Sequence, residues 1–258
     1  MMAASASRIC GIGIDAHNVY FATQAQVWKK PTDSDMKTGD TELARSSGTI
    51  SGGVAVDEQN AYWVSSSDGT LNAVPISGGA VVVLATGLDH SVATLAVRGQ
   101  SLYWTSMGFS RLPGIGTGSV NTAPTAGGAI IPLRAQLGNP IGIAVNARNV
   151  FWAMLGDGSE NYGELLAQAL VDKSGQTLAS RQAGPTALAV DDQNLYWADR
   201  GTAGLPSGSG TGTINKVALV GGTIHTLASN QDGPVAIAVD GKSVYWMNGT
   251  GTVNKVAK

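Results

Sequence analysis

An aromatic pair recurs six times along the chain, each time at the end of a short run of β-branched and small residues. The second members of these pairs lie about 40–50 positions apart, which is the repeat length of β-propeller blades. They are Phe21, Trp63, Trp104, Trp152, Trp197 and Trp246. Six such units constrain the chain to a repeat architecture, because one unit alone cannot bury its own apolar face.

Each unit predicts four short strands, which we name a to d. In the fifth unit, strand a is the Leu-Ala-Val run at 188–190, strand b contains Trp197 and strand c covers 213–219. Gly221 and Gly222 then predict a tight turn to strand d. Six four-stranded units predict an all-β, six-bladed β-propeller that forms one domain over residues 1–258. We expect the N-terminal segment to close the ring as the outer strand of the last blade, since the last repeat stops after its strand c.

The composition agrees with an all-β fold and excludes several other classes. Glycine makes up 35 of the 258 residues and charged residues only 13%, which is unfavourable for a helical bundle because each interior glycine costs a helix about 1 kcal/mol. An apolar content of 43% with a net charge of -2 excludes a disordered chain and a broad basic surface for nucleic acid. No apolar run reaches the length of a membrane span, so we expect no membrane insertion. Cys10 is the only cysteine and cannot form an internal disulfide.

The strand-b motif Tyr-Trp-Ala-Asp at 196–199 resembles the YWTD repeat of six-bladed propellers of the lipoprotein-receptor type. The whole repeat also resembles NHL-type repeats and bacterial YWTD-like repeat proteins. This resemblance covers nearly the whole chain and implies the propeller fold. It implies no single activity, since the scaffold carries receptors, lectin-like modules, lyases and esterase-like enzymes. Only Asp199 fills the fourth position of the motif, so a polar network between blades that depends on this aspartate would be incomplete here.

The repeated tryptophans and aspartates each allow a structural and a functional interpretation. The tryptophans fit a core position, and the alternative is a set of platforms for sugar stacking. The aspartates open the predicted a–b turns, at Asp15, Asp57, Asp191 and Asp240. Asp at the start of a turn accepts hydrogen bonds from the backbone that follows. We therefore favour turn capping over a metal-binding ring, which Arg98 and Asn146 would interrupt.

The segments that break the repeat are the better candidates for function, because binding residues concentrate on loops held by a rigid scaffold. The b–c loop is short in the second and sixth units but long in the third, fourth and fifth, at 107–118, 155–163 and 200–212. In a propeller, the b–c and d–a connections share one face. The predicted binding residues on that face are Asp89, His90, Phe109, Arg111, Asp157, Glu160, Asn161, Tyr162 and Arg200. The alternative is that long loops rich in Gly, Ser and Pro are tolerated insertions.

One long loop partly resembles a calcium-binding loop. Asp157, Ser159 and Asn161 stand at alternate positions, like the first ligands of an EF-hand. Tyr162, however, stands where glycine is needed, and Gln168 where the bidentate glutamate is needed. We therefore expect no cofactor, with calcium at this loop as the alternative.

The sequence contains no assembled catalytic set. His17, His90 and His225 fall in a turn, a connection and a strand, so they are not expected to converge on a metal. We expect a non-catalytic recognition module that binds a protein, peptide or glycan through the loop face. The alternatives are a propeller enzyme of the lyase or lactonase type, with Asp89, His90 and Asp157 at the channel mouth, and a multivalent sugar-binding lectin. We expect a monomer that is extracytoplasmic or secreted, although residues 1–13 contain no signal-peptide pattern.

Overall fold

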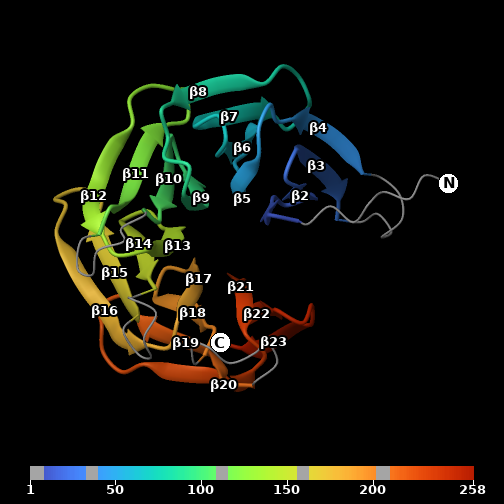
Figure 1. The fold of residues 1–258 in the computed structure, drawn as a ribbon. Helices are drawn as coiled ribbons and strands as arrows, with labels where there is room; N and C mark the ends of the chain where they lie inside the picture. Colours follow the sequence, from blue (N-terminus) through green and yellow to red (C-terminus); the bar gives the residue numbers. More distant parts are fainter. Residues whose placement is uncertain (1–8, 33–39, 109–115, 156–162, 202–209) are drawn as a thin grey trace. The chain divides into compact units, whose positions relative to one another are not determined.

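The computed structural model describes residues 9–32, 40–108, 116–155, 163–201 and 210–258. All regular secondary structure in these residues is β-strand, and the strands form six antiparallel sheets, one for each predicted repeat (Figure 1). No described segment is a helix of the length and apolarity that a membrane span requires. The described chain divides into two compact units, Met1–Ser106 with Val120–Leu133, and Met107–Ser119 with Arg134–Lys258. The prediction of one domain over residues 1–258 stays a prediction.

The first two sheets belong to the first unit, and each follows the chain order strand by strand. The first sheet contains β1 (Gly11–Ile14), β2 (Asn18–Ala22), β3 (Gln26–Pro31) and β4 (Thr41–Arg45). The second contains β5 (Ile50–Val56), β6 (Asn60–Ser65), β7 (Thr70–Pro75) and β8 (Val82–Thr86). The third contains β9 (Val92–Arg98), β10 (Ser101–Ser106), β11 (Gly118–Pro124) and β12 (Ile131–Leu137), and the division between the units falls within β11 and β12.

The remaining three sheets belong to the second unit. The fourth sheet contains β13 (Pro140–Val145), β14 (Asn149–Met154), β15 (Gly163–Ala169) and β16 (Gly175–Gln182). The fifth contains β17 (Pro185–Val190), β18 (Asn194–Asp199), β19 (Gly212–Ala218) and β20 (His225–Gln231). The sixth has three described strands, β21 (Pro234–Val239), β22 (Ser243–Asn248) and β23 (Val253–Ala257). Residues 1–8, the predicted fourth strand of this sheet, lie outside the described residues.

The strand register repeats from sheet to sheet. The second aromatic residue of each pair lies opposite the first residue of the apolar triplet on strand a. These pairs are Phe21 with Ile12, Trp63 with Val54, Trp104 with Leu95, Trp152 with Ile143, Trp197 with Leu188, and Trp246 with Ile237. A shift of one residue would turn each side chain to the other face of its sheet, so the common register confirms the alignment of the six repeats.

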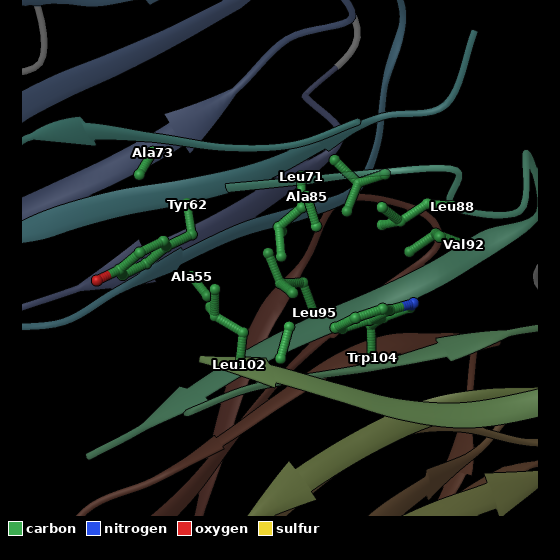
Figure 2. Close-up of a cluster of buried hydrophobic side chains, with 12 residues drawn as sticks. Ala55, Tyr62, Leu71, Ala73, Ala85, Leu88, Val92, Leu95, Leu102 and Trp104 are labelled. Carbon is green, nitrogen blue, oxygen red and sulfur yellow. The ribbon is translucent and has the colours of Figure 1, made fainter. Parts of the chain in front are cut away.

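The five repeated tryptophans are core residues. Their exposed fractions run from 0% for Trp63 and Trp197 to 6% for Trp246. In the first unit, Trp104 packs with Tyr62, Leu71 and other apolar side chains from the second and third sheets (Figure 2). Burial of this kind leaves no ring face for a sugar, so the core interpretation of the tryptophans is confirmed.

Trp28 lies outside the repeat register, and it pairs with the one anchor that is not tryptophan. It sits on β3 directly opposite Phe21 on β2. The two rings are stacked, with centroids 6.3 Å apart and planes 9° from parallel. Stacked aromatic pairs contribute about 0.5–1.5 kcal/mol beyond the area they bury. In the first sheet, the stacked rings of Phe21 and Trp28 therefore supply part of the stabilisation that one buried tryptophan supplies in each other sheet.

A glycine–proline contact recurs three times in the second unit. The first residue of strand c is a buried glycine, and it lies against the buried proline that opens the next strand a. The pairs are Gly118 with Pro140, Gly163 with Pro185, and Gly212 with Pro234. At Gly212, an added Cβ would lie 2.5 Å from Pro234 Cδ and 2.9 Å from the Gln231 carbonyl oxygen. The absence of a side chain at these glycines is what allows successive sheets to approach.

Candidate functional site

Three connections of the first unit meet at one surface, and we call their exposed polar residues the connection surface. The segments are 46–49 between β4 and β5, 66–69 between β6 and β7, and 87–91 between β8 and β9. The connection surface consists of Ser47, Ser66, Ser67, Asp68, Asp89 and His90. All are exposed except Ser66, which is half-buried.

Asp68 is the centre of the hydroxyl contacts on this surface. Ser47 Oγ donates to Asp68 Oδ2 over 2.5 Å, and Ser65 Oγ donates to the same oxygen over 3.0 Å. Ser67 Oγ donates to Oδ1 over 3.2 Å. The hydroxyl of Ser47, followed by that of Ser65, lowers the pKa of Asp68 below its ordinary value. The carboxylate is therefore ionised at neutral pH and held in a fixed orientation by side chains from two connections.

Backbone hydrogen bonds fix the three connections relative to one another. The Ser66 amide donates to the Thr49 carbonyl over 2.8 Å, and the Leu88 amide donates to the Gly69 carbonyl over 3.0 Å. His90 Nδ1 contacts the Ser66 carbonyl oxygen. Because a carbonyl only accepts hydrogen bonds, this contact assigns the proton to Nδ1 and leaves Nε2 of a neutral ring as an acceptor. Asp89 Oδ1 accepts from the amide and the hydroxyl of Ser91 over 2.9 and 2.8 Å.

The same b–c to d–a backbone bond recurs in the second unit. The amide that follows strand b donates to the connection before strand a, as Leu155 does to Asn139 and Arg200 to Gly184. Within each unit, these bonds confirm that the b–c and d–a connections lie together. Arg200, the one predicted binding residue of the second unit that is described, has an exposed side chain at the end of β18.

The structure thus describes three of the nine predicted binding residues. Asp89 and His90 lie together on the connection surface, and Arg200 lies in the other unit. The remaining six lie outside the described residues: Phe109, Arg111, Asp157, Glu160, Asn161 and Tyr162. Sequence reasoning missed Ser47, Ser67 and Asp68, although the Ser-rich segments 46–47 and 65–67 carried a signal.

The described residues contain no group of three or more His, Cys, Asp or Glu side chains arranged to hold a metal ion. Most of the predicted calcium-like loop lies outside those residues. Gln168, which stands at the place of the bidentate ligand, is described and is buried in β15. It pairs with Val150 on one side and Gly175 on the other. Calcium at this loop stays an untested alternative.

The repeated aspartates cap the a–b turns, as the sequence predicts. In each copy, Oδ1 accepts the amides two and three residues later, and Oδ2 accepts the hydroxyl of a tyrosine on strand b. The tyrosine bonds are Tyr20 to Asp15 at 2.7 Å, Tyr62 to Asp57 at 2.7 Å, Tyr196 to Asp191 at 3.0 Å, and Tyr245 to Asp240 at 2.8 Å. Asn146 retains the two amide bonds in the fourth sheet. In each aspartate, Oδ1 caps the turn and Oδ2 ties the turn to strand b, so the turn-capping interpretation is confirmed.

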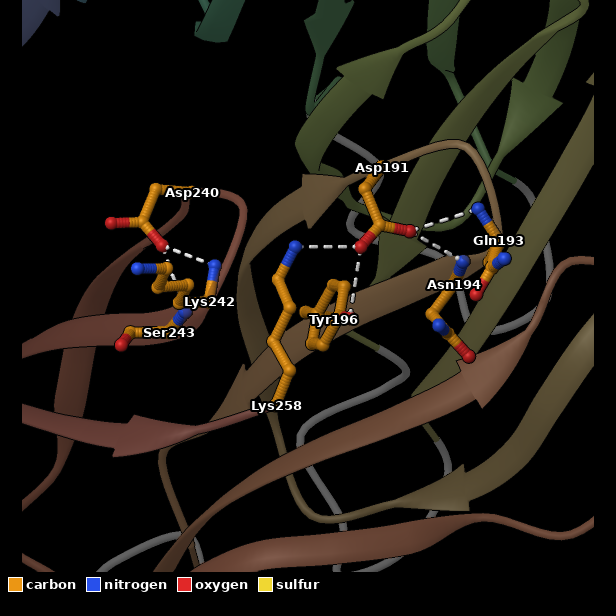
Figure 3. Close-up of polar contacts among 8 residues, drawn as sticks. All are labelled: Asp191, Gln193, Asn194, Tyr196, Asp240, Lys242, Ser243 and Lys258. Carbon is orange, nitrogen blue, oxygen red and sulfur yellow. Dashed lines mark hydrogen bonds and ion pairs between the residues drawn. The ribbon is translucent and has the colours of Figure 1, made fainter.

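Asp191 adds an ion pair to this arrangement, as Figure 3 shows. Lys258 Nζ lies 2.7 Å from Asp191 Oδ2 and 5.3 Å from the centre of the Tyr196 ring. Burial by itself raises the pKa of Asp191, but the hydrogen bonds from Lys258, the Asn194 and Gln193 amides and Tyr196 outweigh it and bring the pKa to about 2. Burial, together with Asp191, raises the pKa of Tyr196 to about 12.

This depressed pKa predicts a specific acid response. The folded state holds the Asp191 proton more weakly than the unfolded chain, so its stabilising effect is present above pH 4 and is lost as pH falls toward 2. The variant Lys258→Met is expected to lower the free energy of unfolding at pH 7 by about 0.5–1 kcal/mol. It is also expected to flatten the loss of stability between pH 4 and 2. Urea denaturation at a series of pH values measures both effects, and an unchanged acid limb would contradict the assignment.

The buried indole groups of the second unit have unequal hydrogen-bond partners. Trp197 Nε1 donates to Gln182 Oε1 at 3.2 Å and to Asp199 Oδ2 at 3.1 Å. Trp246 Nε1 donates to Gln231 Oε1 at 2.7 Å. Trp152 Nε1 has no partner among the described residues. The glutamines stand fifteen positions before their tryptophans, and leucine occupies that place before Trp152.

Asp199, the ionisable partner of Trp197, is buried, with 4% of its surface exposed. Oδ2 accepts hydrogen bonds from Trp197 Nε1, Asn215 Nδ2 and Thr213 Oγ1 at 3.1, 3.0 and 3.5 Å. Oδ1 is buried without a partner among the described residues. Burial raises the pKa of Asp199 to about 6, against the lowering effect of its three hydrogen-bond donors.

No protein-family model matches the chain, and no curated protein matches it either. Solved structures do match the chain. A chain of a nidogen/laminin complex is 18% identical, with a TM-score of 0.72, and the match covers 94% of this protein and 89% of that chain. Virginiamycin B lyase from Staphylococcus aureus is 11% identical with a TM-score of 0.71, over 100% of this protein and 83% of that chain. A streptogramin B lyase is 11% identical with a TM-score of 0.70, over 100% and 85%.

These likenesses concern the fold, because all three identities are low. The backbone that forms the six antiparallel sheets matches these structures over nearly the full chain. The predicted all-β architecture is confirmed, and the fold of the chain is a six-bladed β-propeller.

Proposed function

We propose that this protein is a non-catalytic recognition module that binds a partner through the connection surface. The observation that carries the proposal is the convergence of three separate connections on Asp68 and His90. Their side chains are exposed, yet their positions are fixed by hydrogen bonds within the surface. Groups that are oriented before binding lose less conformational entropy when a partner arrives.

A protein is the partner class that we favour, with a peptide or a glycan as related ligands. The likeness to a chain of a nidogen/laminin complex supports a propeller in a protein-binding role. The chemistry of the surface fits a partner that offers hydrogen-bond donors to Asp68 and to His90 Nε2, and acceptors to the serine hydroxyls. Binding through the long b–c loops of the second unit, by Phe109, Arg111, Asp157, Glu160, Asn161, Tyr162 and Arg200, remains a separate proposal.

The proposal also places the chain among YWTD-like or NHL-like repeat proteins. The Tyr-Trp-Ala-Asp segment at 196–199, in which the indole of Trp197 donates to Asp199, supports this finer assignment. We further propose that the protein is monomeric, extracytoplasmic or secreted, and without a resident cofactor.

The test compares binding by surface variants against a matched control in the same sheet. A protein, peptide and glycan panel identifies a ligand, and calorimetry then gives its affinity for each variant. Asp68→Asn and His90→Ala are each expected to weaken binding about tenfold or more, the usual effect of a central contact. The control is Glu58→Ala, an exposed carboxylate in the a–b connection between β5 and β6. Its binding is expected to be unchanged.

The outcomes separate the competing functions. If all three variants bind the ligand with the affinity of the unmodified protein, a role for the connection surface is contradicted. Repeated turnover of the ligand by the unmodified protein, lost in His90→Ala, would support the enzyme of the lyase type instead. Several ligands bound per chain would support the multivalent lectin, because one connection surface accounts for one.

A further inference from the structure

Asp199 occupies a position at which every other sheet avoids an ionisable side chain. The equivalent residues, two positions after each aromatic anchor, are Thr23, Ser65, Ser106, Met154 and Asn248. The comparison with the sixth sheet is the closest, because Asn248 likewise lies beside a glutamine and a threonine. Its Nδ2 donates to Gln231 Oε1 at 3.4 Å and to Thr252 Oγ1 at 3.3 Å. A neutral amide of the same size thus serves this position one sheet later.

The surroundings of Asp199 supply three donors but no counter-charge. The donors all point to Oδ2, and one of them, Asn215, is held in turn by the Thr226 hydroxyl at 2.8 Å from its Oδ1. Strands β17 and β21 contain no ionisable side chain. The ionisable groups on the other neighbouring segments are Arg181, Arg200, Lys216, His225 and Asp232, and none contributes to the pKa of Asp199. An ionised Asp199 therefore buries a charge with one oxygen unpaired among the described residues, an arrangement that favours the neutral form.

The chain around Asp199 links this carboxyl group to the start of a long connection. Asp199 is the last residue of β18 and pairs with Pro185 on β17 and Thr213 on β19. The next two amides, of Arg200 and Gly201, donate to the Gly184 and Ala183 carbonyls over 2.9 and 3.0 Å. The free-energy cost of ionising Asp199 therefore acts at the end of β18. The 200–212 connection starts from this strand end, which also pairs with Thr213 directly after the connection.

We propose that Asp199 is a proton switch in the fifth sheet: burial without a nearby counter-charge favours the neutral carboxyl group, and ionisation destabilises the end of β18 and the anchored start of the following connection. The sign follows from linkage. The folded state binds the Asp199 proton more tightly than the unfolded chain does, so the stabilisation is present below about pH 4 and is lost as pH rises through about 6. The switch does not depend on the proposed recognition function, and its test reads folding and exchange without a ligand.

The decisive experiment titrates the carboxyl carbon of Asp199 by NMR in the full chain and follows urea unfolding from pH 4 to 8. We expect a midpoint of titration near pH 6 and a urea midpoint that falls as pH rises across this interval. The variant Asp199→Asn copies the side chain of Asn248, and its urea midpoint is expected to be nearly constant over the same interval and higher than that of the unmodified protein at pH 8. Hydrogen exchange at the Arg200 and Gly201 amides is expected to be slower in the variant at pH 7.5 and equal at pH 5.

A second aspartate of the same sheet provides the control. Asp191→Asn removes a carboxylate whose pKa is lowered to about 2, so it is expected to lower the urea midpoint at pH 8, opposite in sign to Asp199→Asn. Titration of Asp199 near pH 4 would overturn the proposal, as would equal pH dependence of Asp199→Asn and the unmodified protein. If Asp199→Asn does not fold, the carboxyl titration of the unmodified protein decides the question alone.

Discussion

Replacing Trp197 with alanine is expected to lower the free energy of unfolding of the second unit by about 3–5 kcal/mol, the usual cost of removing a large buried aromatic side chain. Trp197 has no exposed surface and packs with Phe151, Leu165 and other apolar residues of the fourth and fifth sheets. Its removal also leaves Gln182 Oε1 without the indole donor. Urea or guanidinium denaturation followed by circular dichroism measures the change.

Two further variants identify the origin of this loss. Trp197→Phe keeps an aromatic ring and removes the indole N–H, so we expect it to fall between the unmodified protein and the alanine variant. Val220→Ala changes a side chain that is 91% exposed and is expected to alter stability by less than about 0.5 kcal/mol. A loss below about 1 kcal/mol for Trp197→Ala would contradict the core assignment of the repeated tryptophans.

Adding one methyl group at Gly212 is expected to lower the free energy of unfolding by about 1–3 kcal/mol, the range for overpacked sites. The new Cβ of Gly212→Ala would meet Pro234 Cδ at 2.5 Å, the Gln231 carbonyl oxygen at 2.9 Å and the Asp199 carbonyl oxygen at 3.0 Å. Two of these atoms are backbone and the third belongs to a rigid ring, so the fifth and sixth sheets must shift apart at this point. Chemical denaturation again gives the measurement.

The matched control is Gly241→Ala, which also replaces a glycine of the second unit. An added Cβ there meets nothing within 4 Å, and the residue lies in the turn before β22. This variant is expected to be neutral or slightly stabilising, because alanine restricts the unfolded chain. Equal effects of the two substitutions would mean that the contact between glycine and proline does not limit the approach of the sheets.

The period of the sequence was sufficient to predict the sheets, and the structure adds their register. Each aromatic anchor lies opposite the apolar triplet of its own repeat, as in the pair of Trp197 and Leu188, because antiparallel neighbours in a meander are joined by short turns. The capping role of Asp191 followed from local chemistry, since the two amides and the tyrosine of its turn lie two to five residues away. Interactions that are local, or that repeat along the chain, can therefore be predicted from a single sequence.

The connection surface could be predicted only in part, for a physical reason. Asp89 and His90 were found because the d–a position is defined by the repeat. The contact between Ser47 and Asp68 joins residues of two different connections, neither of which follows a repeated pattern. The buried environment of Asp199 was likewise hidden, because the motif identifies the residue and not the number of donors that reach each of its oxygens.

The unequal partners of the buried indoles have an optical consequence. Excitation moves electron density within the indole ring, so a charge beside the ring nitrogen changes the energy of the emitted light. Trp152, Trp197 and Trp246 share a buried environment, but among these three only the indole of Trp197 donates to an ionisable group in the part of the chain that the structure describes. The contribution of Trp197 to the emission of the six tryptophans is therefore expected to change with the charge of Asp199.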